Sequence, residues 1–164
     1  MNEKTFYNEI LTDHNLHPGN KHDIPDANLV LEGVNPSCGD DITLAAKIED
    51  GIVRDAAYTG HGCAISQASA DMMIDVIKGK TVEEALRLTD LFLSMIKREV
   101  TDEDELEELE DAIALKNISN MPARVKCAVL AWHTLKEALE HKKDKPDGGE
   151  NAGNVCKAEE HEGR

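Results

Sequence analysis

The sequence predicts an α+β domain in which a three-stranded antiparallel sheet packs against several helices. Apolar side chains occupy every second position from Ile42 to Ile48, which is the pattern of a half-buried strand. The Asp50-Gly51 pair that follows is typical of a hairpin turn between two strands. Elsewhere apolar residues recur every three or four positions, which indicates amphipathic helices.

The sheet is expected in the first half of the chain. A helix over residues 3–15 precedes a polar loop at 20–26, and strands follow at 27–34, 42–48 and 52–59. Because the three strands follow one another closely in the sequence, we expect an antiparallel meander.

Helices are expected after the third strand. The first is rich in small residues, and the capping box at 81–84 begins the second. Residues 101–111 are a run of carboxylates, expected to form a solvated segment anchored by Leu106 and Leu109. The last helix begins near Pro122, a residue type favoured in a first helical turn.

The chain is expected to hold one domain and a tail. Its 164 residues are enough for a single hydrophobic core, which we place within residues 1–141. After His141 the composition is dominated by Lys, Asp, Gly, Asn and Glu, which predicts a disordered polar tail over 142–164. This tail contains Cys156.

The charge balance narrows the choice of partners. Against 18 Lys and Arg stand 33 Asp and Glu, and the formal net charge of −15 repels nucleic acid and anionic membranes. No signal peptide and no membrane span of roughly 20 apolar residues is predicted, so we expect a cytoplasmic protein. In that reducing compartment four cysteines are more typical of metal ligands, reactive thiols or buried side chains than of disulfides.

Three cysteines and one aspartate are the candidate metal ligands. Cys38 and Asp40 are separated only by a glycine, so the backbone can bend and direct both side chains to one point. Cys63 and Cys127 lie near the beginnings of two predicted helices. Three sulfurs and one oxygen would suit a tetrahedral Zn²⁺.

The residues alone leave two alternatives open. The cysteines can be unrelated buried residues, because no C-x-x-C pair links any two of them. His61, two residues before Cys63, competes with Asp40 as the fourth ligand, whereas Lys126 would first have to lose a proton. The remaining histidines of the folded part lack ligand spacing, and solvated or packing roles are expected for His14, His17, His133 and His141.

Three segments resemble the cysteine motifs of the U-type proteins of iron–sulfur cluster assembly, the family of IscU, SufU and the N-terminal domain of NifU. They are Asn35-Pro36-Ser37-Cys38-Gly39-Asp40, Gly60-His61-Gly62-Cys63-Ala64-Ile65-Ser66 and Pro122-Ala123-Arg124-Val125-Lys126-Cys127-Ala128. The resemblance extends from the first helix to His141 and implies an IscU/NifU-like fold.

Two features resemble the SufU branch of this family. Lys126 stands where scaffold-type members carry a histidine, and extra residues lie between Glu84 and Leu109. His61 stands where a glutamate is expected. The resemblance implies a zinc-dependent sulfurtransferase that accepts persulfide sulfur from a SufS-type cysteine desulfurase and serves a SufB-SufC-SufD scaffold.

The resemblance also implies roles for single residues. Cys38 is the implied sulfur acceptor, released from the metal when a histidine of the desulfurase replaces it. Asp40, Cys63 and Cys127 would keep the metal meanwhile. Arg124 and His61 are candidates for contacting the partner.

Two rival functions use the same ligands. One is a scaffold that binds iron, assembles a [2Fe–2S] cluster and transfers it, and Lys126 argues against this function because a histidine ligand is missing there. The other is a purely structural zinc domain.

Overall fold

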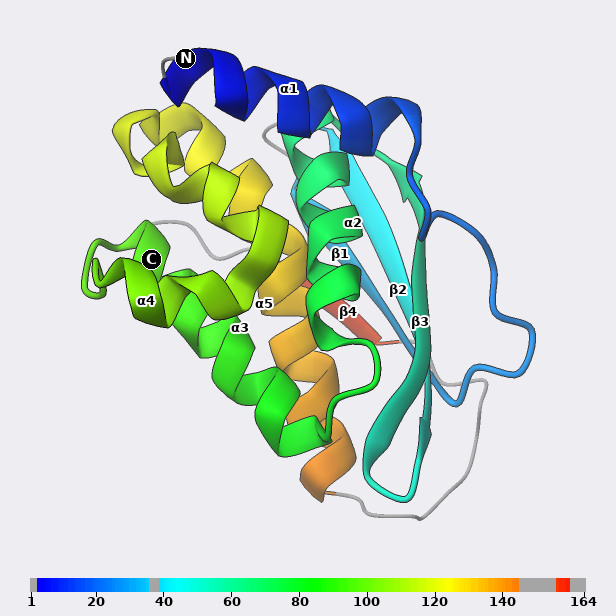
Figure 1. The fold of residues 1–164 in the computed structure, drawn as a ribbon. Coiled ribbons are helices and arrows are strands. Elements are labelled where there is room, and N and C mark those ends of the chain that lie inside the picture. The colour runs from blue at the N-terminus through cyan, green and yellow to red at the C-terminus, as the bar shows by residue number, and fades with distance from the viewer. Residues whose placement is uncertain (1–2, 36–38, 145–155, 160–164) are drawn as a thin grey trace.

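The computed structural model describes residues 3–35, 39–144 and 156–159. Figure 1 shows a layer of strands with helices against one of its faces. Helices α2 (Ala64–Ile77) and α5 (Pro122–Asp144) lie next to the sheet, and α3 (Val82–Ile96) packs against them on the side away from it. The predicted α+β class is confirmed.

Three antiparallel strands form the predicted meander: β1 (Leu29–Asn35), β2 (Asp40–Glu49) and β3 (Ile52–His61). The strand β2 lies between the other two. Every second side chain of β2 from Asp40 to Ile48 is buried, so this face of the strand is the one covered by the helices. The predicted three-stranded sheet is confirmed.

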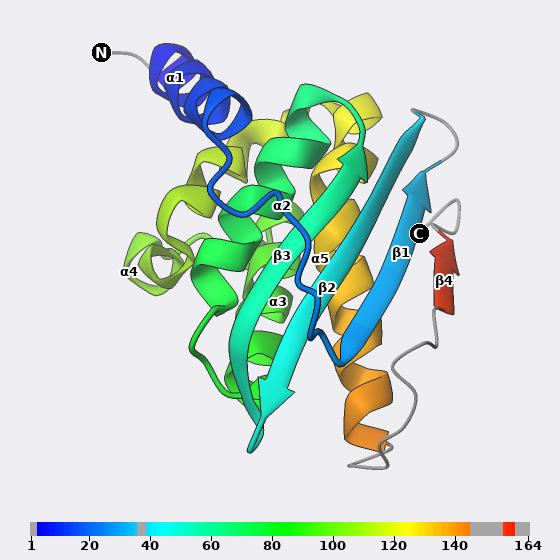
Figure 2. The same ribbon diagram turned by 90° about the vertical axis from the view of Figure 1, so that its right-hand side faces the viewer.

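The other face of the sheet carries no helix among the described residues. Figure 2 shows the segment between α1 (Glu3–Leu16) and β1 crossing this face. The segment is held at the edge of the sheet, where the backbone N–H of Tyr58 donates to the carbonyl oxygen of Asn20 at 2.9 Å. Within it, Ile24 is buried.

The expected disordered tail differs from the structure at two segments. Helix α5 continues through Asp144, and Cys156–Glu159 forms a fourth strand, β4, parallel to β1. The register pairs Leu31 with Cys156 and Val34 with Glu159. The physical reason is the open edge of β1, whose backbone groups accept a further strand whatever the polarity of its side chains.

The acidic segment is helical rather than irregular. It begins as the short helix α4 (Glu103–Leu106) and continues as the 3₁₀ helix η1 (Glu107–Asn120). Leu106 and Leu109 are fully buried, as the sequence predicts. None of the helices in the described ranges is long and apolar enough to cross a membrane.

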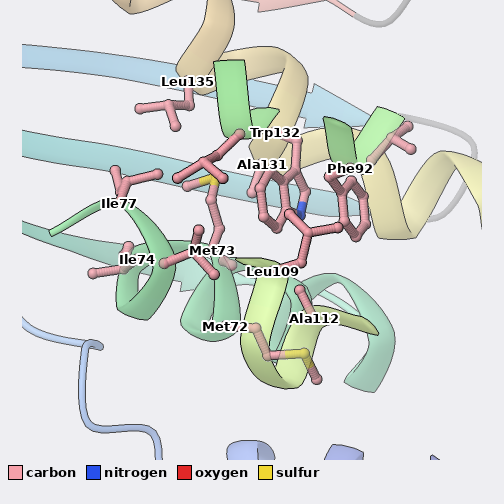
Figure 3. Close-up of a cluster of buried hydrophobic side chains, with 14 of the residues drawn as sticks. Met72, Met73, Ile74, Ile77, Phe92, Leu109, Ala112, Ala131, Trp132 and Leu135 are labelled. Carbon is pink, nitrogen blue, oxygen red and sulfur yellow. The ribbon is translucent and has the colours of Figure 1, made fainter. Parts of the chain in front are cut away.

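The interior between the helices is organised by an aromatic pair. The rings of Phe92 on α3 and Trp132 on α5 stack with centroids 4.0 Å apart (Figure 3). The indole N–H of Trp132 donates to Ser69 Oγ on α2 at 2.8 Å, and that hydroxyl donates to the carbonyl oxygen of Ala128 at 2.6 Å. These contacts fix α5 against α2 beside Cys127.

Candidate metal centre

Three of the four candidate ligands meet at one end of the sheet. Asp40 is the first residue of β2, Cys63 is the N-cap of α2, and Cys127 lies in the second turn of α5. The two sulfurs and a carboxylate oxygen all lie within 4.8 Å of one another. Asp40 and Cys127 are completely buried, whereas Cys63 is half-buried.

The connection between β3 and α2 brings Cys63 to Asp40. In the antiparallel register His61 pairs with Asp41, so the chain leaves β3 beside the beginning of β2. Gly62 then passes directly over the carboxylate, and a Cβ at this position would lie 2.7 Å from Asp40 Oδ1. Only glycine allows so close an approach of the backbone.

The two oxygens of Asp40 have different surroundings. Oδ1 accepts hydrogen bonds from the backbone N–H of Cys63 at 2.9 Å and from Ser66 Oγ at 3.2 Å. Oδ2 is buried and has no hydrogen-bond partner among the described residues. Leaving a buried charged oxygen without a partner costs more than the roughly 1–3 kcal/mol of a neutral group. A cation bound at Oδ2 would remove this cost.

The sulfur of Cys63 caps helix α2. It accepts the backbone N–H of Ser66 at 3.4 Å, the position of a conventional side-chain N-cap. The first N–H groups of a helix carry a partial positive charge, which complements negative charge on this sulfur.

The arrangement fits a transition metal such as zinc. Two sulfurs and one oxygen are ligand types that Zn²⁺ takes in tetrahedral sites, and the close grouping leaves a fourth position for one more donor. The buried, unbonded Oδ2 of Asp40 is the feature of this structure that favours a metal over a merely packed cluster. Because all three donors are on regular elements, their positions do not depend on a loop.

The other candidate residues have different positions. Cys38 lies outside the described residues, between Asn35 at the end of β1 and Gly39. His61 is exposed and is not part of the group formed by Asp40, Cys63 and Cys127.

Two further candidates are on α5. Lys126 is half-buried next to Cys127, and Arg124 is exposed in the first turn.

Sequence reasoning missed two polar residues beside the ligands. Ser66 donates to Asp40, and Asn35 is buried opposite Asp40 at the end of β1. Both residues are within the quoted cysteine motifs, so their nearness in sequence to Cys63 and Cys38 was the available signal.

The fold and the aspartate–cysteine cluster define a small α+β protein with a candidate metal centre, and comparison with known proteins gives its family. Residues 6–147 match the family model described as the NifU-like N-terminal domain. The chain belongs to this family.

Two relatives cover most of the chain. The iron–sulfur cluster assembly scaffold protein IscU of Thermotoga maritima is 45% identical over 136 residues, which are 83% of this chain and 94% of that protein. The zinc-dependent sulfurtransferase SufU of Bacillus subtilis is 42% identical over 139 residues, which are 84% of this chain and 92% of that protein.

A solved structure supports the same assignment. A proposed iron–sulfur cluster assembly scaffold protein for the SUF system from Fervidobacterium islandicum is 38% identical, with a TM-score of 0.76 over 84% of this chain and 99% of that one. The implied IscU/NifU-like fold and the resemblance to SufU-type members are confirmed.

Proposed function

We propose that this protein is a zinc-dependent sulfur acceptor of iron–sulfur cluster assembly. The observation that carries the proposal is the buried Oδ2 of Asp40, which has no hydrogen-bond partner among the described residues, in a group with the thiols of Cys63 and Cys127. The Bacillus relative named as a zinc-dependent sulfurtransferase supports the choice of metal and of activity.

Four residues would hold the metal. They are Asp40, Cys63 and Cys127 from the regular elements, with Cys38 as the fourth donor. When bound, Zn²⁺ supplies positive charge that keeps the cysteine sulfurs deprotonated near neutral pH. Ser66 and the backbone N–H of Cys63 hold Oδ1 of Asp40, so that Oδ2 keeps one orientation.

Cys38 is the proposed sulfur acceptor. Its thiolate attacks the outer sulfur of a persulfide on the desulfurase, and a new sulfur–sulfur bond forms on Cys38 as the bond in the desulfurase persulfide breaks. The bond pair leaves with the desulfurase cysteine as a thiolate, and any proton on the transferred sulfur remains there. Asp40, Cys63 and Cys127 come from β2, α2 and α5, so they can keep the metal during this exchange.

The proposed partners are a SufS-type cysteine desulfurase and, downstream, a SufB-SufC-SufD scaffold in the cytoplasm. The net charge of −15 favours a basic docking surface on the desulfurase. His61 and Arg124 are exposed and precede the ligands Cys63 and Cys127 by two and three residues, so they are the proposed contacts near the centre.

The test begins with protein purified without oxygen. About one zinc per chain and no acid-labile sulfide are expected, and the protein should stimulate cysteine turnover by a SufS-type desulfurase. Cys38→Ala should keep most of its zinc and lose the stimulation, whereas the control Cys156→Ala should keep both. A Cys38→Ala variant that still stimulates the desulfurase would exclude Cys38 as the acceptor.

A scaffold function is the second candidate, favoured by the 45% identity to the Thermotoga protein named as a scaffold. In this case the same residues would hold iron or a [2Fe–2S] cluster. Iron with a matching amount of acid-labile sulfide, together with no stimulation of the desulfurase, would replace the first proposal by this one.

A further inference from the structure

The side chain of Asn35 has an unexplained position. It is the last residue of β1, only 1% exposed, and its Nδ2 has no hydrogen-bond partner among the described residues. Within the part of the chain that the structure describes, the other buried side-chain nitrogen or oxygen without a partner is Asp40 Oδ2. The two unbonded atoms therefore belong to the same end of the sheet.

The strand register places Asn35 beside the metal centre. Asn35 and Asp40 are direct partners in the β1–β2 pair, and both are buried on the face covered by the helices. Directly opposite residues have Cβ atoms about 4.5–5.5 Å apart. The amide is thus one side chain away from the cluster of Asp40, Cys63 and Cys127.

An unbonded amide at this place has an energetic cost and a possible purpose. A buried donor without an acceptor costs about 1–3 kcal/mol, and the nearby Oδ2 does not satisfy it. Two thiolates and one carboxylate carry three negative charges against the two positive charges of a divalent metal. The surplus is negative, and sulfur ligands in such a site are stabilised by N–H donors.

We propose that Asn35 is a positioning residue of the metal centre, whose Nδ2 donates a hydrogen bond to a ligating sulfur of the Cys63 and Cys127 pair when a metal is bound. This inference rests on the proposed metal site and is independent of the sulfur-transfer step. It makes the end of β1 part of the outer shell of the centre, together with Ser66 on α2.

The experiment uses Co²⁺ as a probe, because its thiolate charge-transfer bands report on the ligating sulfurs. Asn35→Leu and the smaller Asn35→Ala both remove the donor, and the second adds no bulk. Asn20→Leu is the matched control, because Asn20 is a buried asparagine whose amide is fully engaged with Asp71 and Asp75. Zn²⁺ affinity is measured alongside by competition with a chelator.

The expected result separates Asn35 from Asn20. Both Asn35 variants should shift the charge-transfer bands and bind Zn²⁺ about 10–100-fold more weakly, the usual effect of losing an outer-shell partner. Metal-free Asn35→Leu should be as stable in urea as the wild type or more stable, because an unbonded donor has been removed. Asn20→Leu should lose stability and keep the bands unchanged.

Two other outcomes would overturn the inference. Unchanged bands and affinity in both Asn35 variants would refute the hydrogen bond while leaving the metal site intact. A wild-type protein without thiolate bands would instead refute the metal site itself, and the inference with it.

Discussion

Two buried polar clusters of this protein are built on opposite principles. In the metal centre of Asp40, Cys63 and Cys127, a buried carboxylate oxygen has no partner among the described residues. The second, the His14 cluster, consists of His14 on α1, Asn20 and Asp71 on α2. There, His14 Nδ1 lies 2.6 Å from Asp71 Oδ2, and Asp71 Oδ1 accepts the backbone N–H of Asn20 at 3.0 Å.

The difference shows how to distinguish a ligand site from a structural one. His14, Asp71 and Asp75 also have ligand atoms within 4.8 Å of one another. However, both ring nitrogens of His14 are already bonded, Nδ1 to Asp71 and Nε2 to Asp111 at 3.0 Å. Proximity of ligand types is therefore common to both clusters, and the unbonded atom is what indicates a missing ligand. The His14 cluster instead fastens α1 to α2 and η1.

The largest effect is expected from breaking the His14 cluster. Asp71→Ala leaves His14 and Asn20 buried without their main partner, and removing one member of a buried charge pair costs about 3–5 kcal/mol. Urea unfolding measures the loss, and zinc affinity should change little. Asp75→Ala is the control, because this exposed carboxylate accepts only one printed bond, from Asn20. Equal losses in the two variants would contradict the structural role of Asp71.

The second effect concerns the metal centre. Asp40→Ala removes a ligand oxygen, so zinc affinity should fall by more than about 100-fold, beyond what loss of an outer-shell partner causes. The metal-free variant should lose little stability, because an uncompensated buried charge disappears with the side chain. Asp41→Ala, on the opposite face of β2, should bind zinc normally. Full zinc affinity in Asp40→Ala would assign the fourth ligand position to His61 or water.

The third prediction uses the opposite pH dependence of the two clusters. Burial lowers the pKa of His14, but hydrogen bonds and charges from Asp71 and Asp111 outweigh this and raise it above 6.5. The protonated ring therefore stabilises the fold fully below pH 6.5, and this contribution is lost as the pH rises through the raised pKa. Zinc affinity should instead rise with pH, because its ligands must be deprotonated.

The measurement is urea unfolding of chelated protein between slightly acidic and alkaline pH. The wild type should lose stability as the pH rises, and His14→Gln should remove most of this slope. A slope that persists in His14→Gln would assign the titration to another group.

The sequence predicted the sheet, the helices and the ligand types because these depend on local patterns. Alternation in β2 and the Asp50-Gly51 turn define the meander without any knowledge of its neighbours. The His14 cluster was not predictable in this way, because His14 and Asp71 are 57 residues apart and their contact depends on how α1 docks. The strand β4 was missed for a related reason: the open edge of β1, not the composition of residues 156–159, selects it.

The smallest effect should come from Ser66, which tests whether the two oxygens of Asp40 have separate roles. Ser66→Ala removes one donor to Oδ1 and leaves the backbone N–H of Cys63 in place. Loss of one such hydrogen bond costs about 0.5–1.5 kcal/mol, so zinc affinity should fall by roughly 2- to 13-fold.

Ser69→Ala is the matched control, one turn further along the same helix. Its hydroxyl accepts the indole N–H of Trp132 and donates to Ala128, so its loss should lower stability more than zinc affinity. If Ser66→Ala instead destabilised the metal-free protein as much as Ser69→Ala does, Ser66 would be a packing residue. The bonded oxygen of Asp40 would then have the same structural role as the carboxylate of Asp71, and only Oδ2 would distinguish the two clusters.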